Sequence, residues 1–419
     1  MSHREEAVQG PPEGFKIATS FQYPGRPNFQ IADTLFKDIA RRIQLSPTDY
    51  RTAVGHYEAV DEWLTRENSP LAPYMSRVYA QGSMAIGATI SSKLNNDEFD
   101  VDAVAELRFA ADAPPGKVLD VLFDAINGEK GSRYYGKVER RSRCVTIAYD
   151  RMHLDVTPAL LLPHLNERTS VIFHANEKEP PEKHRHIKAN PWGFADWFAK
   201  STPQVAEILD AVLAKRAEPV PDQDEVLDKS RPLVALQLLK RWRNKRYDNR
   251  PGRNPPSVIL AYYVATNMTG STDLYGEFRA QAEGIHAIVA AADQQGKLIS
   301  VVNPACNTDV LSDRWPGDLA TQRVFLADLK DLLAKLDKLE ADPSVEKCAE
   351  IMTDLFGENP TRVVIQDFQK RFAAKAQTGG LFAQGGSGGL ALGASGLAAK
   401  PTPSPAYPIR RHTDFGSND

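Results

Sequence analysis

Residues 76–107 read SRVYAQGSMAIGATISSKLNNDEFDVDAVAEL, and this stretch decides the fold of the chain. Its pattern predicts a strand, a sharp turn at Gly82 and Ser83, a short helix, a loop and a second strand. Because side chains alternate between the two faces of a strand, Asp100 and Asp102 project to the same side of the second strand. Two carboxylates held so close repel each other, and a bound cation would remove that repulsion.

The residues before these carboxylates have the features of a phosphate site. Gly82 lets backbone N–H groups approach an anion, Ser83 adds a hydroxyl, and the helix that follows would direct its positive end toward that anion. Hard divalent ions such as Mg²⁺ take oxygen ligands from carboxylates, water and phosphates. The stretch therefore predicts a metal-bound phosphate between the turn and the second strand.

A third carboxylate, Asp155, lies in the segment RMHLDVTPALLL at residues 151–162, which again alternates as a strand does. Three carboxylates beside a Gly-Ser turn are the arrangement that nucleotidyl transfer requires, in which one metal activates the attacking hydroxyl and both stabilise the reacting phosphate. Glu98 shares its strand face with Asp100 and Asp102, so Glu98 and Asp100 form an alternative pair of ligands.

The segments QGSMAIGATI, FDVDAVAEL and HLDVTPAL together resemble the DNA polymerase beta-like nucleotidyltransferases. Among these, the chain is similar to the bacterial CD-NTases of SMODS type, which are relatives of cyclic GMP-AMP synthase and oligoadenylate synthase. The resemblance extends over residues 35–375. It implies an α+β fold with a polymerase beta-like sheet lobe, a mostly helical lobe like that of oligoadenylate synthase, and an active site in the cleft between them.

The resemblance also implies an activity and its ligands. CD-NTases join NTPs into cyclic di- or trinucleotide second messengers with release of pyrophosphate, in anti-phage (CBASS) signalling. Two Mg²⁺ ions, for which Mn²⁺ can substitute, would be held by Asp100, Asp102 and Asp155, and ATP is expected among the substrates. We prefer Asp102 to Glu98 because an apolar strand directly follows Asp102, as in the Asp-x-Asp members of the family.

Residues 240–253 contain seven basic residues and one acid, on a predicted helix and the loop after it. A charge run of this kind is usually a solvated helix face. In the family, however, a lysine on this helix and a serine beyond it contact the donor nucleotide, and Lys240 and Ser257 match them. Together with Gly82 and Ser83, they form the predicted substrate-binding set.

Two other groups of polar residues receive a structural interpretation. Arg140, Arg141 and Arg143 precede a predicted strand, and we interpret them as a solvated edge in preference to a nucleotide contact. Residues 174–190 contain three histidines without regular spacing, so we predict a surface loop there and no metal site.

Composition limits the classes of function. With 51 basic and 54 acidic residues, the formal net charge is −3, so any site for a polyanion must be local. The three cysteines lie far apart, which argues against structural zinc and predicts a reducing compartment. The sequence lacks a signal pattern and an apolar run of membrane-spanning length, so we expect a cytoplasmic protein without a membrane partner. Clustered Cys and His of a zinc thumb are also missing, so activation by duplex DNA has no support.

We divide the chain into four segments by composition and periodicity. Residues 1–30 are predicted to form a flexible arm, residues 31–204 the nucleotidyltransferase core and residues 205–375 the helical lobe. Residues 376–419 are a low-complexity tail that we expect to be disordered. The tail ends in IRRHTDFGSND, a candidate motif for a regulatory protein partner.

Two alternatives to cyclic nucleotide synthesis stay open at this point. A polymerase beta-like transferase could extend RNA or nucleotidylate a protein with the same three carboxylates. A nucleotide-binding sensor that has lost catalysis is the alternative from another class, and the intact carboxylates argue against it.

Overall fold

The computed structural model describes residues 30–91, 99–109, 112–162, 168–202, 229–267, 269–377, 382–384 and 390–392. Glu98, residues 1–29 of the predicted arm and the predicted partner motif lie outside the described residues. Within the predicted tail, the structure describes a pair of short antiparallel strands, β10 (Phe382–Gln384) and β11 (Leu390–Leu392). No described helix combines the length and apolar character that a membrane span requires.

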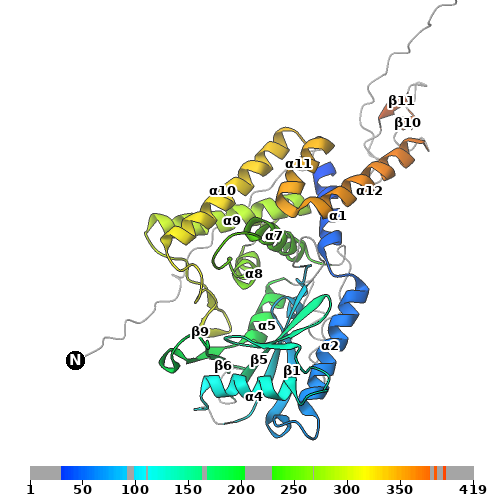
Figure 1. The fold of residues 1–419 in the computed structure, drawn as a ribbon. Helices are drawn as coiled ribbons and strands as arrows, with labels where there is room; N and C mark the ends of the chain where they lie inside the picture. Colours follow the sequence, from blue (N-terminus) through cyan, green and yellow to red (C-terminus); the bar gives the residue numbers. More distant parts are fainter. Residues whose placement is uncertain are drawn as a thin grey trace, which may run out of the picture.

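A seven-stranded mixed sheet forms the first lobe (Figure 1). Its main path runs β1-β2-β5-β4-β3. Strand β6 pairs with the C-terminal end of β5, and β7 pairs with β6. The central pair, β2 and β5, is parallel, and the other pairs are antiparallel. The strands are β1 (Met75–Gln81), β2 (Phe99–Leu107), β3 (Val138–Arg140), β4 (Val145–Ala148), β5 (Met152–Leu161), β6 (Ser170–His174) and β7 (Arg185–Ala189).

Two helices, α2 (Pro47–Thr65) and α4 (Pro115–Asn127), pack with one face of this sheet. Val101, Ala103 and Ala105 of β2 are buried in the core that they share. Because side chains alternate along a strand, Asp100 and Asp102 lie on the opposite face. The apolar half of the alternation thus anchors the strand that presents the carboxylates.

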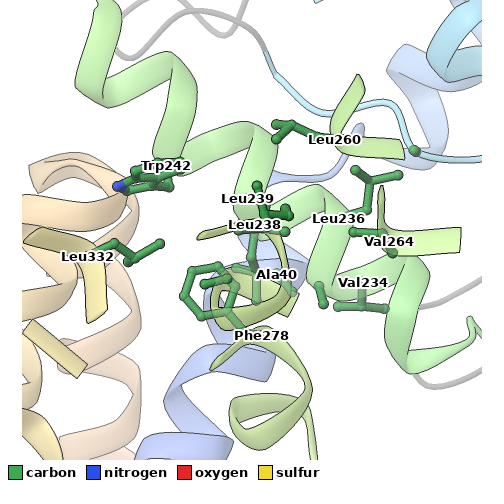
Figure 2. Packing of buried hydrophobic residues seen from close by; sticks show 14 of the residues in the cluster. Ala40, Val234, Leu236, Leu238, Leu239, Trp242, Leu260, Val264, Phe278 and Leu332 are labelled. Atoms are coloured by element: carbon green, nitrogen blue, oxygen red, sulfur yellow. The ribbon is translucent and has the colours of Figure 1, made fainter. Parts of the chain in front are cut away.

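The second lobe is a bundle of helices around α7 (Figures 1 and 2). Leu239 lies near Phe278 in this core, with Trp242 further along α7 (Figure 2). The lobe contains α7 (Arg231–Tyr247), α8 (Ser257–Thr266), α9 (Leu274–Gln294), α10 (Leu319–Ala341), α11 (Val345–Phe356) and α12 (Glu358–Gln377).

Helix α1 (Gln30–Ile43) precedes the sheet in sequence but packs in the helical core. Phe36 of α1 makes edge contacts with Tyr275, Phe278 and Phe356 of the helical lobe, at ring-centroid distances of 5.2 to 5.4 Å. The described part of the chain therefore starts in the helical lobe at α1, crosses to the sheet lobe along α2 and later returns to the helical lobe. The predicted boundaries of the four segments stay a prediction.

A small hairpin from the helical lobe docks on the sheet lobe. It consists of β8 (Val302–Asn303) and β9 (Cys306–Val310), and it contacts the start of α5 (Pro191–Ser201). The Asn303 amide donates to the carbonyl oxygen of Asn190 at 2.9 Å and to Asp309 at 2.8 Å, and Asp309 also accepts from the Asn190 N–H at 3.2 Å. Desolvation raises the pKa of Asp309. This buried network joins the two lobes.

The α+β fold with a sheet lobe and a helical lobe is confirmed. The prediction of a surface loop over residues 174–190 is wrong in part, because residues 185–189 form strand β7. Strand β7 pairs with β6, whose Phe173 is buried. Sequence periodicity missed this strand because four of its five residues are polar or small and it lies at the edge of the sheet.

The central position of α7 predicts where the fold is most sensitive. Leu239→Ala should lower the free energy of unfolding by about 3 kcal/mol, since it leaves a cavity at a fully buried site. Urea denaturation of both proteins measures this difference. Leu298→Ala is the matched control, because Leu298 is 40% exposed, and its change should stay within about 0.5 kcal/mol. Equal losses in both variants would contradict this account of the core.

Candidate active site

Strands β2 and β5 bring the three predicted carboxylates to one face of the sheet. In their parallel register, Asp102 lies opposite Asp155, and Asp100 lies opposite His153. Partners directly opposite each other share a face, so Asp100, Asp102 and Asp155 project to the same side. The structure thus brings together three side chains that are separated by up to 55 positions in the sequence.

The charges of these carboxylates interact strongly. The pKa of Asp102 is raised to about 7 by desolvation and by the negative charges of Asp155 and Asp100, while Lys240 acts in the opposite direction. Repulsion of this kind disfavours the fully ionised cluster, and a bound cation would relieve it. The site therefore favours positively charged ligands.

Gly82 connects the predicted phosphate turn to this cluster. Its φ of +60° lies in the left-handed region, and a Cβ at this position would stand 2.5 Å from Oδ2 of Asp102. The four-residue helix α3 (Gly82–Ala85) begins here, and the Ser83 hydroxyl accepts from Thr89 at 3.4 Å. A side chain on residue 82 would occupy the space beside the carboxylate, so this position requires glycine.

Helix α7 holds the segment that follows α3. Three of its side chains donate hydrogen bonds to backbone carbonyl groups of residues 87–91. The bonds run from Gln237 to Gly87 and Thr89 (both 3.4 Å), from Lys240 to Ala88 (2.8 Å) and from Arg241 to Ser91 (3.3 Å). The helical lobe thereby fixes the position of the turn that the sheet lobe carries.

Lys240 contacts the segment that follows the turn and is almost fully buried. Its pKa is lowered to about 7 by desolvation and by the charge of Arg243, and the charges of Asp102 and Asp100 partly offset this. Lys240 lies within electrostatic reach of Asp102 and Asp100, and its role in substrate binding stays a prediction. Lys240 does not lie on a solvated helix face, because its amine donates a hydrogen bond to the carbonyl oxygen of Ala88.

The contacts of Ser257 lie further from the three carboxylates than those of Lys240. It opens helix α8 and is half-buried, and no hydrogen bond within the described chain joins its hydroxyl to the other predicted residues. Arg243 connects the two regions, because its guanidinium donates to the carbonyl oxygen of Pro255 at 2.9 Å and lies within electrostatic reach of Asp100. Sequence reasoning missed Arg243, although it follows Lys240 by about one helical turn.

Asp155 is held from strand β4. Thr146, which lies opposite it in the antiparallel register, donates its hydroxyl to the carboxylate, and the Cys144 thiol is hydrogen-bonded to the same group. Burial and the charges of Asp155 and Asp102 raise the pKa of the Cys144 thiol. Sequence reasoning missed both residues, although the hairpin turn at residues 150–151 predicts the Thr146–Asp155 pair.

Comparison with known proteins identifies the family. The Second Messenger Oligonucleotide or Dinucleotide Synthetase (SMODS) domain matches residues 31–201. The cyclic dinucleotide synthase CdnG of Bradyrhizobium diazoefficiens is 32% identical over 95% of this chain and 98% of its own length. The chain belongs to the SMODS family of bacterial CD-NTases. It is accordingly a nucleotidyltransferase, and its activity is the synthesis of cyclic oligonucleotides.

A second relative and a solved structure of the same Bradyrhizobium protein support this assignment. The c-di-GMP synthase of Roseivirga ehrenbergii is 26% identical over 92% of this chain and 97% of its own length. The solved structure of the Bradyrhizobium CdnG in complex with GTP superposes with a TM-score of 0.67 at 30% identity, covering 80% of this chain and 99% of that one. The predicted polymerase beta-like architecture with its helical second lobe is thereby confirmed.

The carboxylates of this SMODS protein fit divalent metal ions by their chemistry. Their oxygens are the ligands that Mg²⁺ prefers, and the raised pKa of Asp102 reflects a repulsion that a cation would relieve. Among the described residues, no group of three His, Cys, Asp or Glu side chains is positioned to hold a metal ion. Asp155 is instead engaged by Thr146 and Cys144.

Gly82→Ala should reduce nucleotide synthesis by about 100-fold, because the new Cβ would displace the Asp102 carboxylate. Pyrophosphate release from NTPs measures this loss. Gly296→Ala is the matched control: its φ is +65°, yet a Cβ there meets nothing within 4 Å. Both positions have a similar positive φ, so comparable activities in the two variants would show that the collision with Asp102 has no functional effect.

Proposed function

We propose that this CD-NTase joins NTPs into a cyclic di- or trinucleotide with release of pyrophosphate, and that Asp100, Asp102 and Asp155 form its catalytic centre. The observation that carries the proposal is the pairing of Asp102 with Asp155 beside the Gly82 turn. The names of the two curated relatives favour a cyclic dinucleotide. A role in anti-phage (CBASS) signalling agrees with the family.

Each residue of the site has a role in this proposal. The three carboxylates would hold two Mg²⁺ ions, which Mn²⁺ can replace, and when bound these ions supply positive charge at the reacting phosphate and its nucleophile. Gly82 and Ser83 cradle the donor phosphates on the backbone of the turn. Lys240 stabilises the segment after that turn and, when protonated, adds positive charge near the phosphates, and Ser257 reaches the donor nucleotide from α8.

Guanine nucleotides are the first substrates to test. One relative is named a c-di-GMP synthase, and the structure of the Bradyrhizobium CdnG contains GTP. We therefore propose GTP as a substrate, and ATP as a second candidate. Incubation of the full-length protein with GTP, ATP and their mixture, followed by mass spectrometry of nuclease-resistant products, tests the proposal. Extension of added RNA without a cyclic product would favour an RNA-directed transferase.

The double substitution Asp100→Asn with Asp102→Asn should abolish product formation with Mg²⁺ or Mn²⁺, because it removes two anionic ligands from the centre. Circular dichroism should report an unchanged fold, since Asp100 is exposed on the sheet face opposite the core. Asp150→Asn serves as the control on an exposed turn and should leave synthesis intact. Normal turnover by a folded double variant would remove both aspartates from the mechanism.

Lys240→Ala should weaken NTP binding, with the KM for NTP rising about tenfold and kcat falling less. The physical reason is the loss of the protonated amine near the phosphates together with its hydrogen bond to Ala88. Steady-state kinetics at varied NTP concentration measures both parameters. Lys245→Ala on the same helix is the control and should leave KM unchanged; an unchanged KM in both variants would limit Lys240 to a structural role.

A further inference from the structure

A short junction between helices α1 and α2 joins the two lobes, and Gln44 lies in its middle. Ile43, the last residue of α1, is buried in the core of the helical lobe, whereas Leu45 is buried in the core of the sheet lobe. The chain therefore passes from one hydrophobic core to the other within three residues. Gln44 is the half-buried polar residue at this crossing.

The segment that follows the turn at residue 82 makes the opposite crossing, next to the first one. Met84 is buried in the core of the sheet lobe, and Ile86 is buried in that of the helical lobe. The Ser91 N–H donates to the carbonyl oxygen of the last residue of α1 at 2.9 Å, and Gln44 forms an antiparallel bridge with Ile90. The junction thus lies directly against the segment into which the turn leads.

The side chain of Gln44 takes part in a series of hydrogen bonds that ends on this segment. Its Nε2 donates to Oε1 of Gln237 at 2.8 Å, and Nε2 of Gln237 donates to the carbonyl oxygens of Gly87 and Thr89, both at 3.4 Å. On its other side, Oε1 of Gln44 accepts from the amine of Lys229 at 3.2 Å. Three side chains from different elements are therefore connected in one direction, from Lys229 to the segment.

The order of donors and acceptors in this series determines how the amide of Gln237 is oriented. A lysine amine can only donate, so the oxygen of Gln44 faces Lys229 and its NH₂ group faces Gln237. The oxygen of Gln237 then faces Gln44, which leaves its NH₂ group for the carbonyl groups of the segment. Gln237 is fully buried, so a reversed amide would leave these polar groups without partners.

We propose that Gln44 is a positioning residue for nucleotidyl transfer, because it orients the Gln237 amide that holds residues 87–89. The inference rests on the proposed function, which assigns the donor phosphates to the turn at Gly82. Gln44 acts through Gln237 and not on the substrate. Since Gly82 lies against Asp102, a shift of the segment would move the phosphate site relative to the carboxylates.

The competing explanation is that Gln44 only stabilises the junction between α1 and α2. In that case the number of hydrogen bonds at residue 44 matters, and the direction in which they run does not. If Gln44 is a positioning residue, direction matters most, because only one orientation of the Gln237 amide offers donors to the segment. The two explanations therefore predict different orders of activity among variants of residue 44.

Two substitutions of nearly equal size separate these explanations. Gln44→Glu still accepts from Lys229 and forms an ion pair with it, but it has no N–H for Gln237. The Gln237 amide must then turn, and its oxygen faces the carbonyl groups of the segment. Gln44→Met removes both hydrogen bonds of the side chain without forcing this turn. Gln366→Glu, at an exposed position of α12, is the matched control for the added charge.

We expect Gln44→Glu to lower kcat for pyrophosphate release about tenfold, and Gln44→Met to lower it about threefold. The melting temperatures of these two variants should follow the opposite order. Glutamate gains the pair with Lys229, whereas methionine leaves the buried oxygen of Gln237 without its donor. Gln366→Glu should match the parent protein in both measurements.

Hydrogen exchange supplies a measurement that does not depend on catalysis. In Gln44→Glu, the backbone N–H groups of residues 82–91 should exchange about fivefold faster than in the parent protein, because the segment is no longer held. Mass spectrometry of peptides from this region measures the difference. The exchange of the same residues in Gln366→Glu should equal that of the parent protein.

Three results would overturn the inference. A kcat equal to that of the parent in folded Gln44→Glu would mean that the orientation of Gln237 has no effect on the reaction. Activities that fall in the same order as the melting temperatures would limit Gln44 to stabilising the junction. Unchanged exchange over residues 82–91 in Gln44→Glu would show that the segment is not held through Gln44.

Failure of the proposed function would give a different result. The parent protein would then release no pyrophosphate from GTP or ATP, whatever the residue at position 44. Hydrogen exchange would still decide whether Gln44 holds the segment, because it requires no turnover.

Discussion

The hydrogen bonds from α7 to the backbone of residues 87–91 are the constraint on which the catalytic arrangement depends. Gln237, Lys240 and Arg241 are buried, and they donate to carbonyl groups of the segment that follows β1 and the Gly82 turn. Because a buried donor without a partner is costly, these bonds favour one position of the segment. The Gly82 turn is thereby held against Asp102, and the geometry of the centre follows from the contact between lobes.

Negative and positive side chains gather at separate places near the contact between the two lobes. Desolvation and the charges of Asp155 and Asp100 raise the pKa of Asp102, whereas desolvation and the charges of Arg143 and Arg253 lower the pKa of Arg314. In each group the like charges repel one another, and ligands of the opposite charge would reduce that repulsion. A substrate that combines metal ions with phosphate chains satisfies both requirements at once, and this supports a nucleotide-joining enzyme.

The elements nearest the site could be predicted from local patterns, and those that assemble it could not. Strand β2 follows from its alternation, and α7 follows from its apolar face and the proline in its first turn. By contrast, α1 lies in the core of the helical lobe, which no periodicity within the helix indicates. Strand β7 was missed because its polar residues and edge position leave no apolar alternation to detect.

The sequence by itself determined which chemical groups the site contains. The two-residue period of a strand requires that Asp100 and Asp102 share a face, and the glycine at residue 82 permits a turn that other residues resist. Only the tertiary structure decided what surrounds them. Thr146 and Cys144 are hydrogen-bonded to Asp155, and Lys240 is buried beside Ala88. Arginines from both lobes, Arg143 and Arg314, come within electrostatic reach of each other. The physical reason is the distance in sequence over which each effect acts. Backbone geometry acts over a few residues, whereas burial and charge act through space between segments that are far apart in the sequence.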